Sequence, residues 1–116
     1  MQRKPTLLRA ETDGHNATLT LKIDRELEDF KGHFPTFPLL PGVTQIDLAV
    51  RYAMEYLPTE GVFGGMEVIK FQDPILPDSI ITLTLKWDEE KHKLYFSYQS
   101  GDRAHSSGRI LISEAA

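Results

Sequence analysis

One segment of this chain has the apolar spacing of a long α-helix, and segments that alternate apolar and polar residues flank it. The helical pattern runs over residues 41–57, with a proline at the first helical position and Pro58 marking the end. One stripe of this helix is expected to face the core: Val43, Ile46, Val50, Ala53, Met54 and Leu57. A single long helix among several strands restricts the chain to a small set of folds.

Period-two alternation predicts the strands. Residues 17–23 alternate throughout, and residues 6–12 supply a partner strand across a turn at residues 13–16. After the helix, further strands are expected at residues 66–71, 81–87, 94–98 and 108–113, with a bulge between Val68 and Ile69. This order predicts an α+β fold in which one helix packs on an antiparallel sheet. Since one helix covers only one face of the sheet, its edge or its other face is expected to be covered by a second subunit.

Length and composition narrow the function. The 116 residues suit one domain, spanning residues 1–116. A formal charge of −4 argues against nucleic acid as the main ligand. No stretch approaches the ~20 apolar residues of a membrane span and no signal peptide opens the chain, so a cytoplasmic location is expected. The absence of cysteine excludes disulfides, thiolate nucleophiles and Cys-ligated metals.

A proline-spaced loop precedes the helix, within the irregular residues 24–40. Its prolines are Pro35, Pro38 and Pro41, and each pushes the residue before it towards extended geometry. A proline-rich recognition ligand is one interpretation of such a segment. The large apolar residues between the prolines favour a buried loop instead.

Three residues around this loop could carry acid–base chemistry. Gly42 offers the first free N–H of the helix, because Pro41 has none, and helix starts attract negative charge; alternatively Gly42 merely relieves crowding. Asp47 either pairs with Arg51 one turn later or lies at the mouth of an apolar cleft, where loss of water favours the protonated acid. His33 is either a structural, hydrogen-bonded residue or a neutral base.

The remaining histidines, His15, His92 and His105, lie in or beside polar turns and are expected to be solvated. No histidine and acid spacing typical of zinc is present, and no phosphate loop or dinucleotide fingerprint. These patterns predict neither a metal nor a nucleotide cofactor.

Taken together, the run His33-Phe34-Pro35-x-x-Pro38-x-x-Pro41-Gly42-Val43 and Asp47 closely resemble the signature of the hotdog-fold 3-hydroxyacyl-[acyl-carrier-protein] dehydratases. Residues 69–78 are similar to that family's later strand and Pro-rich turn. Many members carry glutamate where this chain has Asp47, and the aspartate resembles the branch that also isomerises the double bond. Residues 44–49 and the short chain resemble the compact dehydratases of aryl polyene pathways.

The resemblance implies a fold, a reaction and a set of site residues. The helix is wrapped by a curved antiparallel sheet, and two subunits join their sheets. His33 of one subunit takes a proton from C2 of a 3-hydroxyacyl thioester, and Asp47 of the partner assists loss of the 3-hydroxyl as water. The Gly42 N–H polarises the thioester carbonyl and the Leu39 carbonyl orients the His33 ring. The acyl chain is expected along the helix stripe, beside Phe34, Phe37 and Val43, with no metal or redox cofactor.

The same resemblance implies a partner, an acyl carrier protein with a phosphopantetheine-linked chain. Such carriers are acidic, so docking needs a local basic patch, for which Arg51, Lys31 and Lys70 are candidates. The working dimer is either a homodimer or a heterodimer with a second dehydratase subunit. Two other functions stay open: a thioesterase on the same fold, and a non-catalytic acyl-binding subunit that pairs with an active dehydratase.

Overall fold

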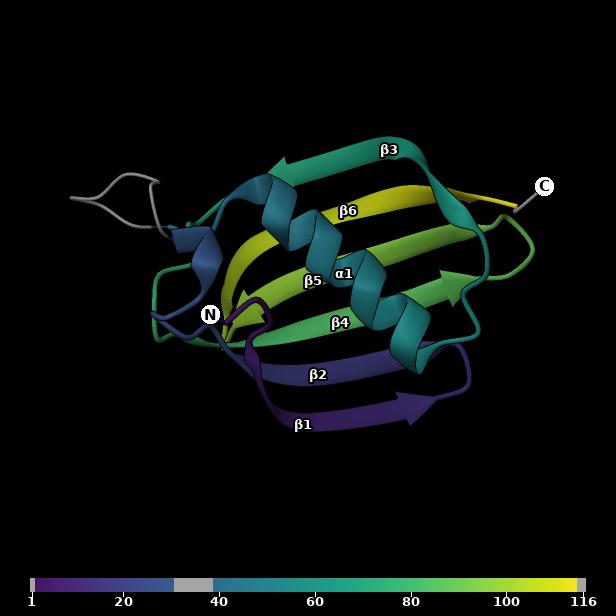
Figure 1. Ribbon diagram of the computed structural model, residues 1–116. Coiled ribbons are helices and arrows are strands. Elements are labelled where there is room, and N and C mark those ends of the chain that lie inside the picture. The colour runs from purple at the N-terminus through teal and green to yellow at the C-terminus, as the bar shows by residue number, and fades with distance from the viewer. Residues whose placement is uncertain (1, 31–38, 115–116) are drawn as a thin grey trace.

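A computed structural model describes residues 2–30 and 39–114 and shows one α-helix lying diagonally across one face of a six-stranded sheet (Figure 1). The strand order is β1-β2-β4-β5-β6-β3, and every neighbouring pair is antiparallel. The predicted α+β class is therefore confirmed. The elements are β1 Thr6–Asp13, β2 Asn16–Lys22, the 3₁₀ turn Glu28–Phe30, α1 Gly42–Tyr56, β3 Val62–Phe71, β4 Ile80–Asp88, β5 Lys93–Ser100 and β6 Arg103–Ser113.

The central strands follow the predicted alternation. β2, β4 and β5 lie within two residues of their expected bounds and bury every second side chain towards the helix. β3 and β6 begin earlier than expected, at Val62 and Arg103. The β3 ladder shifts register on either side of Gly64 and of Glu67, so the bulge predicted between Val68 and Ile69 was wrong in position. Glu67 is the extra residue, and it forms ion pairs with Lys93 at 3.0 Å and with Arg109 at 3.2 Å.

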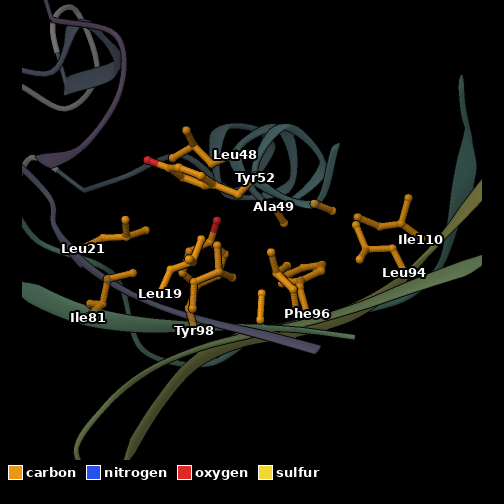
Figure 2. Packing of buried hydrophobic residues seen from close by; sticks show 14 of the residues in the cluster. Leu19, Leu21, Leu48, Ala49, Tyr52, Ile81, Leu94, Phe96, Tyr98 and Ile110 are labelled. Atoms are coloured by element: carbon orange, nitrogen blue, oxygen red, sulfur yellow. The ribbon is translucent and has the colours of Figure 1, made fainter. Parts of the chain in front are cut away.

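The core lies between the helix and the middle of the sheet. Figure 2 shows Leu48, Ala49 and Tyr52 of α1 facing apolar side chains of the strands. Fully buried Leu, Ile or Phe side chains each contribute roughly 1.5–3 kcal/mol of burial free energy, so this layer is the main source of stability. The labelled strand residues are Leu19, Leu21, Ile81, Leu94, Phe96, Tyr98 and Ile110.

The buried face of the helix is centred about a third of a turn from the predicted stripe. Ala53 and Leu57 are buried as predicted, and Ile46 and Val50 are partly buried against the core. Val43 is 75% exposed and Met54 is 38% exposed, although both were expected inside. The helix residues that the structure buries are Gln45, Leu48, Ala49, Tyr52 and Ala53. The polar Gln45 can face the sheet because both ends of its side-chain amide form hydrogen bonds. The more apolar stripe turns towards β3 instead.

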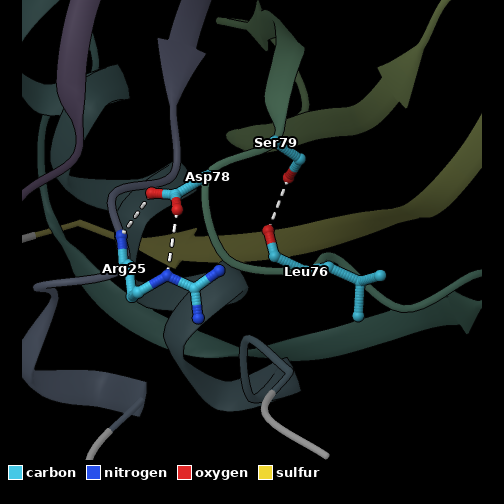
Figure 3. Close-up of polar contacts among 4 residues, drawn as sticks. All are labelled: Arg25, Leu76, Asp78 and Ser79. Atoms are coloured by element: carbon cyan, nitrogen blue, oxygen red, sulfur yellow. Dashed lines mark hydrogen bonds and ion pairs between the residues drawn. The ribbon is translucent and has the colours of Figure 1, made fainter.

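The connection between β3 and β4 is clamped to the end of β2. Asp78 accepts hydrogen bonds from the backbone N–H and the side chain of Arg25, both at 3.0 Å (Figure 3). Those contacts hold the pKa of Asp78 below its usual value. The Ser79 hydroxyl donates a hydrogen bond to the Leu76 carbonyl at 2.6 Å. The same connection holds the chain before the helix, since the Leu40 N–H donates to the Ile75 carbonyl at 2.8 Å.

A buried carboxylate fastens the N-terminal segment to the end of β2. One oxygen of Asp24 accepts from the Thr6 N–H and hydroxyl, both at 2.8 Å, and from the Gln2 amide at 2.6 Å. Burial alone would raise the pKa of Asp24. The hydrogen bonds from Thr6 and Gln2, with nearby Lys22, outweigh burial and hold the pKa below its usual value.

This lowered pKa predicts acid-sensitive stability. The ionised Asp24 stabilises the folded state above its unfolded pKa of ~3.9, and this contribution disappears as the pH falls through the lower folded pKa. We expect Asp24→Asn to lower the urea midpoint at pH 7 and to flatten its decline between pH 6 and pH 3. Urea titrations between pH 6 and pH 3 measure the midpoint of each protein, with Asp13→Asn in the exposed hairpin as control. Parallel declines for wild type and Asp24→Asn would contradict the assignment.

Candidate active site

An apolar cavity of about 610 Å³ lies between the helix and β3. The helix contributes the stripe that the core does not use, and β3 contributes the opposite wall. Asp47 is the single titratable side chain among the described lining residues. The described lining of the cavity is therefore apolar except for this one carboxylate. The lining residues are Gly42, Val43, Ile46, Asp47 and Val50 from α1 and Phe63, Met66, Ile69 and Phe71 from β3.

Gly42 begins the helix and is one of the residues that line this cavity. Pro41 is the N-cap and donates no hydrogen bond, while its carbonyl accepts from the N–H groups of Thr44 and Gln45, each at 3.1 Å. Within residues 2–30 and 39–114, no acceptor faces the Gly42 N–H. The positive end of the helix dipole therefore stays available to a carbonyl oxygen that gains negative charge.

The ring of Phe71 lies directly against Gly42. A Cβ atom built on Gly42 would lie 2.6 and 2.9 Å from two ring carbons of Phe71. No side chain larger than hydrogen fits there without moving the ring. The close approach of the Phe71 ring supports the interpretation that Gly42 relieves crowding, and its role as a donor to a substrate oxygen stays a prediction.

Asp47 lies at the rim of the cavity, on the second turn of the helix. Its side chain is 63% exposed, and the nearest Arg51 guanidinium nitrogen is 3.6 Å from its carboxylate. In the single chain Asp47 pairs with Arg51 and borders the apolar cleft, but its carboxylate stays mostly exposed, so its role as an acid deprived of water remains a prediction. An exposed i,i+4 pair of this kind contributes only about 0.3–0.5 kcal/mol, so stability gives little reason for an acid here.

His105 was expected to be solvated, and this prediction was wrong. The residue is 5% exposed, because β6 begins earlier than the sequence indicated and turns the ring inward. Its Nδ1 lies 3.1 Å from the Asp73 carbonyl and its Nε2 lies 2.5 Å from the Ser100 hydroxyl. Since a carbonyl only accepts, Nδ1 donates a hydrogen bond to the Asp73 carbonyl, and Nε2 is hydrogen-bonded to the Ser100 hydroxyl. His92 is half-buried against Trp87, and His15 is exposed as expected.

Two further cavities adjoin the start of the helix. One, of about 420 Å³, is lined by Leu39, Gly42, Phe71 and His105 among others. The other is a polar cleft of about 910 Å³ between the β3–β4 connection and the β5–β6 turn, and it shares Asp73 and His105 with the first. Gly42 and Phe71 line both the apolar cavity and the 420 Å³ cavity, so these two spaces meet at the helix N-terminus, and the larger cleft adjoins the second of them.

A family model described as ApeI-like, ApeI dehydratase, matches residues 9–109 of this chain. The chain belongs to the ApeI-like dehydratase family. A solved structure of the dehydratase heterocomplex ApeI:P from Xenorhabdus doucetiae matches with 39% identity and a TM-score of 0.91, covering 96% of this chain and 99% of that one. An uncharacterised protein from Erwinia carotovora subsp. atroseptica matches with 38% identity and a TM-score of 0.83, covering 96% and 97%. The predicted hotdog fold, a central helix wrapped by a curved sheet, is confirmed.

Curated relatives outside the ApeI-like group are more distant. The 3-hydroxyacyl-[acyl-carrier-protein] dehydratase FabZ of Ruminiclostridium cellulolyticum is 34% identical over 61 residues, covering 47% of this chain and 43% of that enzyme. The FabZ of Erythrobacter litoralis is 31% identical over 77 residues, covering 59% and 51%. The match spans about half the length of these relatives.

Some of the predicted site residues lie together in the structure, and others lie outside the residues that it describes. Gly42, Val43 and Asp47 line one apolar cavity of this ApeI-like chain, and Leu39 lines its neighbour. His33, Phe34 and Phe37 lie outside the described residues, as does Lys31. In the part of the chain that the structure covers, no group of three histidine or acidic residues could hold a metal ion, and no helix could cross a membrane.

Sequence reasoning missed the β3 wall and the polar residues behind the helix start. Met66, Ile69 and Phe71 were treated only as strand residues, and Phe63 was not assigned to a strand. An edge strand so rich in apolar side chains is itself a signal. Gln45 was overlooked because an amide rarely faces a core. Its spacing with Leu48, Ala49 and Tyr52 could have revealed the buried stripe.

The contact between Gly42 and Phe71 predicts a measurable coupling. Gly42→Ala should destabilise the wild-type chain by about 1 kcal/mol more than it destabilises a Phe71→Ala chain, because only the wild type has the ring in the way. Urea denaturation of the four proteins gives the coupling free energy. The same cycle with Phe63→Ala, which lines the cavity away from Gly42, is the control and should give none. Equal coupling in both cycles would contradict the contact.

Proposed function

We propose that this protein is a 3-hydroxyacyl-[acyl-carrier-protein] dehydratase, a hydro-lyase that converts a 3-hydroxyacyl thioester to the trans-2-enoyl thioester in fatty acid or aryl polyene biosynthesis. One observation carries the proposal: Gly42 at the helix start and Asp47 on the next turn line the same apolar cavity. An apolar cavity suits an acyl chain, the N–H suits a thioester oxygen, and the acid suits a leaving hydroxyl. The family match supports the reaction class, and the aryl polyene assignment rests on its ApeI-like branch.

Each residue has one role in the elimination. His33 accepts the proton from C2, and the C2–H electrons form the new double bond as the C3–O bond breaks. Asp47 delivers a proton to the departing 3-hydroxyl, directly or through a bound water, so that water leaves. The Gly42 N–H donates to the thioester oxygen while it carries negative charge, and the Leu39 carbonyl orients the His33 ring. The role of His33 rests on the sequence motif.

We also propose that the site is completed by a second subunit joined through β3. This strand is the edge of the sheet and exposes a row of large apolar side chains, an arrangement that favours pairing with another strand. Dimerisation there would cover the rim where Asp47 is now mostly exposed and would bring His33 of one subunit to Asp47 of the other. The exposed residues of β3 are Val62, Phe63, Met66, Val68 and Phe71.

The substrate carrier would be an acyl carrier protein with a phosphopantetheine arm. Because such carriers are acidic and this chain has a net charge of −4, docking requires a local basic surface. Arg51 lies one turn from Asp47 with its side chain 49% exposed, and Lys70 is exposed on β3 beside the cavity wall. These two residues are the docking candidates that the structure describes, and Lys31 is a third candidate from the sequence alone.

A second candidate is a subunit of a two-protein dehydratase. The structure that matches at a TM-score of 0.91 is described as a dehydratase heterocomplex, which makes a heterodimeric working form a direct alternative to the homodimer. In that case this chain would either hold the complete site with its partner or bind the acyl chain without catalysing its dehydration. Asp47 at an otherwise apolar rim favours the catalytic role, since acyl binding alone needs no acid.

The activity is tested with a 3-hydroxyacyl carrier protein and intact-protein mass spectrometry. Wild type should produce an enoyl product about 18 Da lighter, whereas release of free thiol would identify a thioesterase. His33→Ala and Asp47→Asn should each lower the rate by about 10²–10⁴-fold, as expected for loss of a general base or acid. Asp13→Asn, a control acid in the hairpin, should keep it. Wild-type rates in His33→Ala would overturn the mechanism.

The assembly is tested by sedimentation. One chain has a mass of 13.2 kDa, and wild type should sediment at twice this value. Met66→Glu should shift it to the monomer, because a carboxylate on the apolar β3 surface opposes burial. Leu8→Glu, at a similarly exposed position on the opposite edge strand, should leave the dimer intact. A wild type that sediments as a monomer and dehydrates substrate only with an added second subunit would support the heterocomplex.

A further inference from the structure

We propose that Gln45 is a positioning residue of this site, whose side-chain amide fixes the direction of the Gly42 N–H. The inference rests on the proposed function, because it assigns Gln45 to the same thioester-binding donor. It concerns a side chain that neither touches the apolar cavity nor belongs to the loop motif.

The amide of Gln45 links the chain before the helix to strand β6. Gln45 is 4% exposed; its Nε2 donates to the Leu40 carbonyl at 3.1 Å, and its Oε1 accepts from the Ser106 hydroxyl at 2.6 Å. Because a carbonyl can only accept, the NH₂ group must face Leu40 and the oxygen must face Ser106. The main-chain carbonyl of Gln45 accepts separately from the Tyr98 hydroxyl at 2.7 Å.

These contacts leave the peptides around Leu40 little freedom. The Leu40 N–H donates to Ile75 at 2.8 Å, its carbonyl is held by Gln45, and its side chain is buried. Pro41 follows with its ring-restricted φ at −59°. The next N–H in the chain is that of Gly42. One anchor from the β3–β4 connection, one from the Gln45 side chain and the proline ring therefore restrict the chain directly before this donor.

The same end of β6 also forms hydrogen bonds to residues 72 and 73, which follow the Phe71 wall beside Gly42. His105, next to Ser106, binds the Asp73 carbonyl through its ring and accepts the Gln72 N–H on its own carbonyl at 2.9 Å. Gln72 directly follows Phe71, whose ring lies against Gly42. Adjacent residues of β6 thus fix both the donor and the aromatic wall that faces it. A donor held this rigidly needs no rearrangement as charge develops on the thioester oxygen.

The experiment compares three substitutions that disturb Gln45 in different ways. Gln45→Met keeps the volume and removes the amide, and Gln45→Glu keeps the acceptor for Ser106 but lacks a donor for Leu40 when ionised. Tyr98→Phe is the matched control, because it removes a hydrogen bond to the same residue without touching the amide. Steady-state dehydration of the carrier-bound substrate and thermal unfolding are measured for each protein.

We expect both Gln45 variants to lower kcat by about 10- to 100-fold at pH 8 with KM within about twofold, since misplacing a catalytic group by about 1 Å has such an effect. Gln45→Glu should recover relative to Gln45→Met as the pH falls, because the protonated acid can donate to Leu40. The titratable groups around the site, Tyr98, His105 and Asp47, are the same in both variants. Tyr98→Phe should lower the melting temperature and keep kcat within about twofold.

Two results would overturn the proposal. One is wild-type kcat in both Gln45 variants; the other is a loss of kcat in Tyr98→Phe as large as theirs. Should the wild type dehydrate no substrate, the proposed function fails, and the ¹⁵N–¹H resonance of Gly42 decides the positioning role alone. That resonance should shift or broaden in Gln45→Met and stay in place in Tyr98→Phe; an unchanged resonance in Gln45→Met would overturn the positioning role.

Discussion

The constraint behind this structure is that one helix must cover a sheet of six strands. The helix packs through Leu48, Ala49 and Tyr52 on the middle strands, and burial of that layer supplies most of the folding free energy. It cannot also cover β3 at the edge of the sheet. The 610 Å³ cavity is the space left between the helix and that edge. The cavity that forms the candidate site is therefore a consequence of the packing that stabilises the fold.

Local pattern was enough to predict the strands and the helix, because each depends on side chains that alternate or recur within a few residues. The alternation in residues 17–23 and 81–87 left little choice of register, and the turn at Gly14 adopts the positive φ that glycine allows. The face of the helix was harder to predict. Hydrophobicity alone selected Val43 and Met54, whereas the sheet accepted Gln45, whose polar atoms find partners that only the tertiary structure provides.

The site residues that lie in one sequence segment could be predicted. The site residues that come together from distant segments could not. The glycine and the acid at the start of the helix lie within six residues, so one motif was enough to associate them. β3 forms the other wall, but it reaches that place by pairing with β6, about 40 residues further along the chain. His105 shows the same limit: its turn-like surroundings suggested solvent, while the strand ladder places it inside. Long-range pairing, not local pattern, decides such positions.

The helix start shows what the chain forgoes to keep this site open. Helices are commonly stabilised by a Ser, Thr, Asp or Asn at the N-cap, at about 1 kcal/mol, and by acids in the first turn. Here the N-cap is Pro41, its first turn carries no acid, and the described residues offer no acceptor for the Gly42 N–H. The core elsewhere tolerates this loss, since its apolar layer is far larger in free energy. Water or a ligand oxygen can satisfy the Gly42 N–H, and a helix start without a side-chain cap keeps that place open to a ligand.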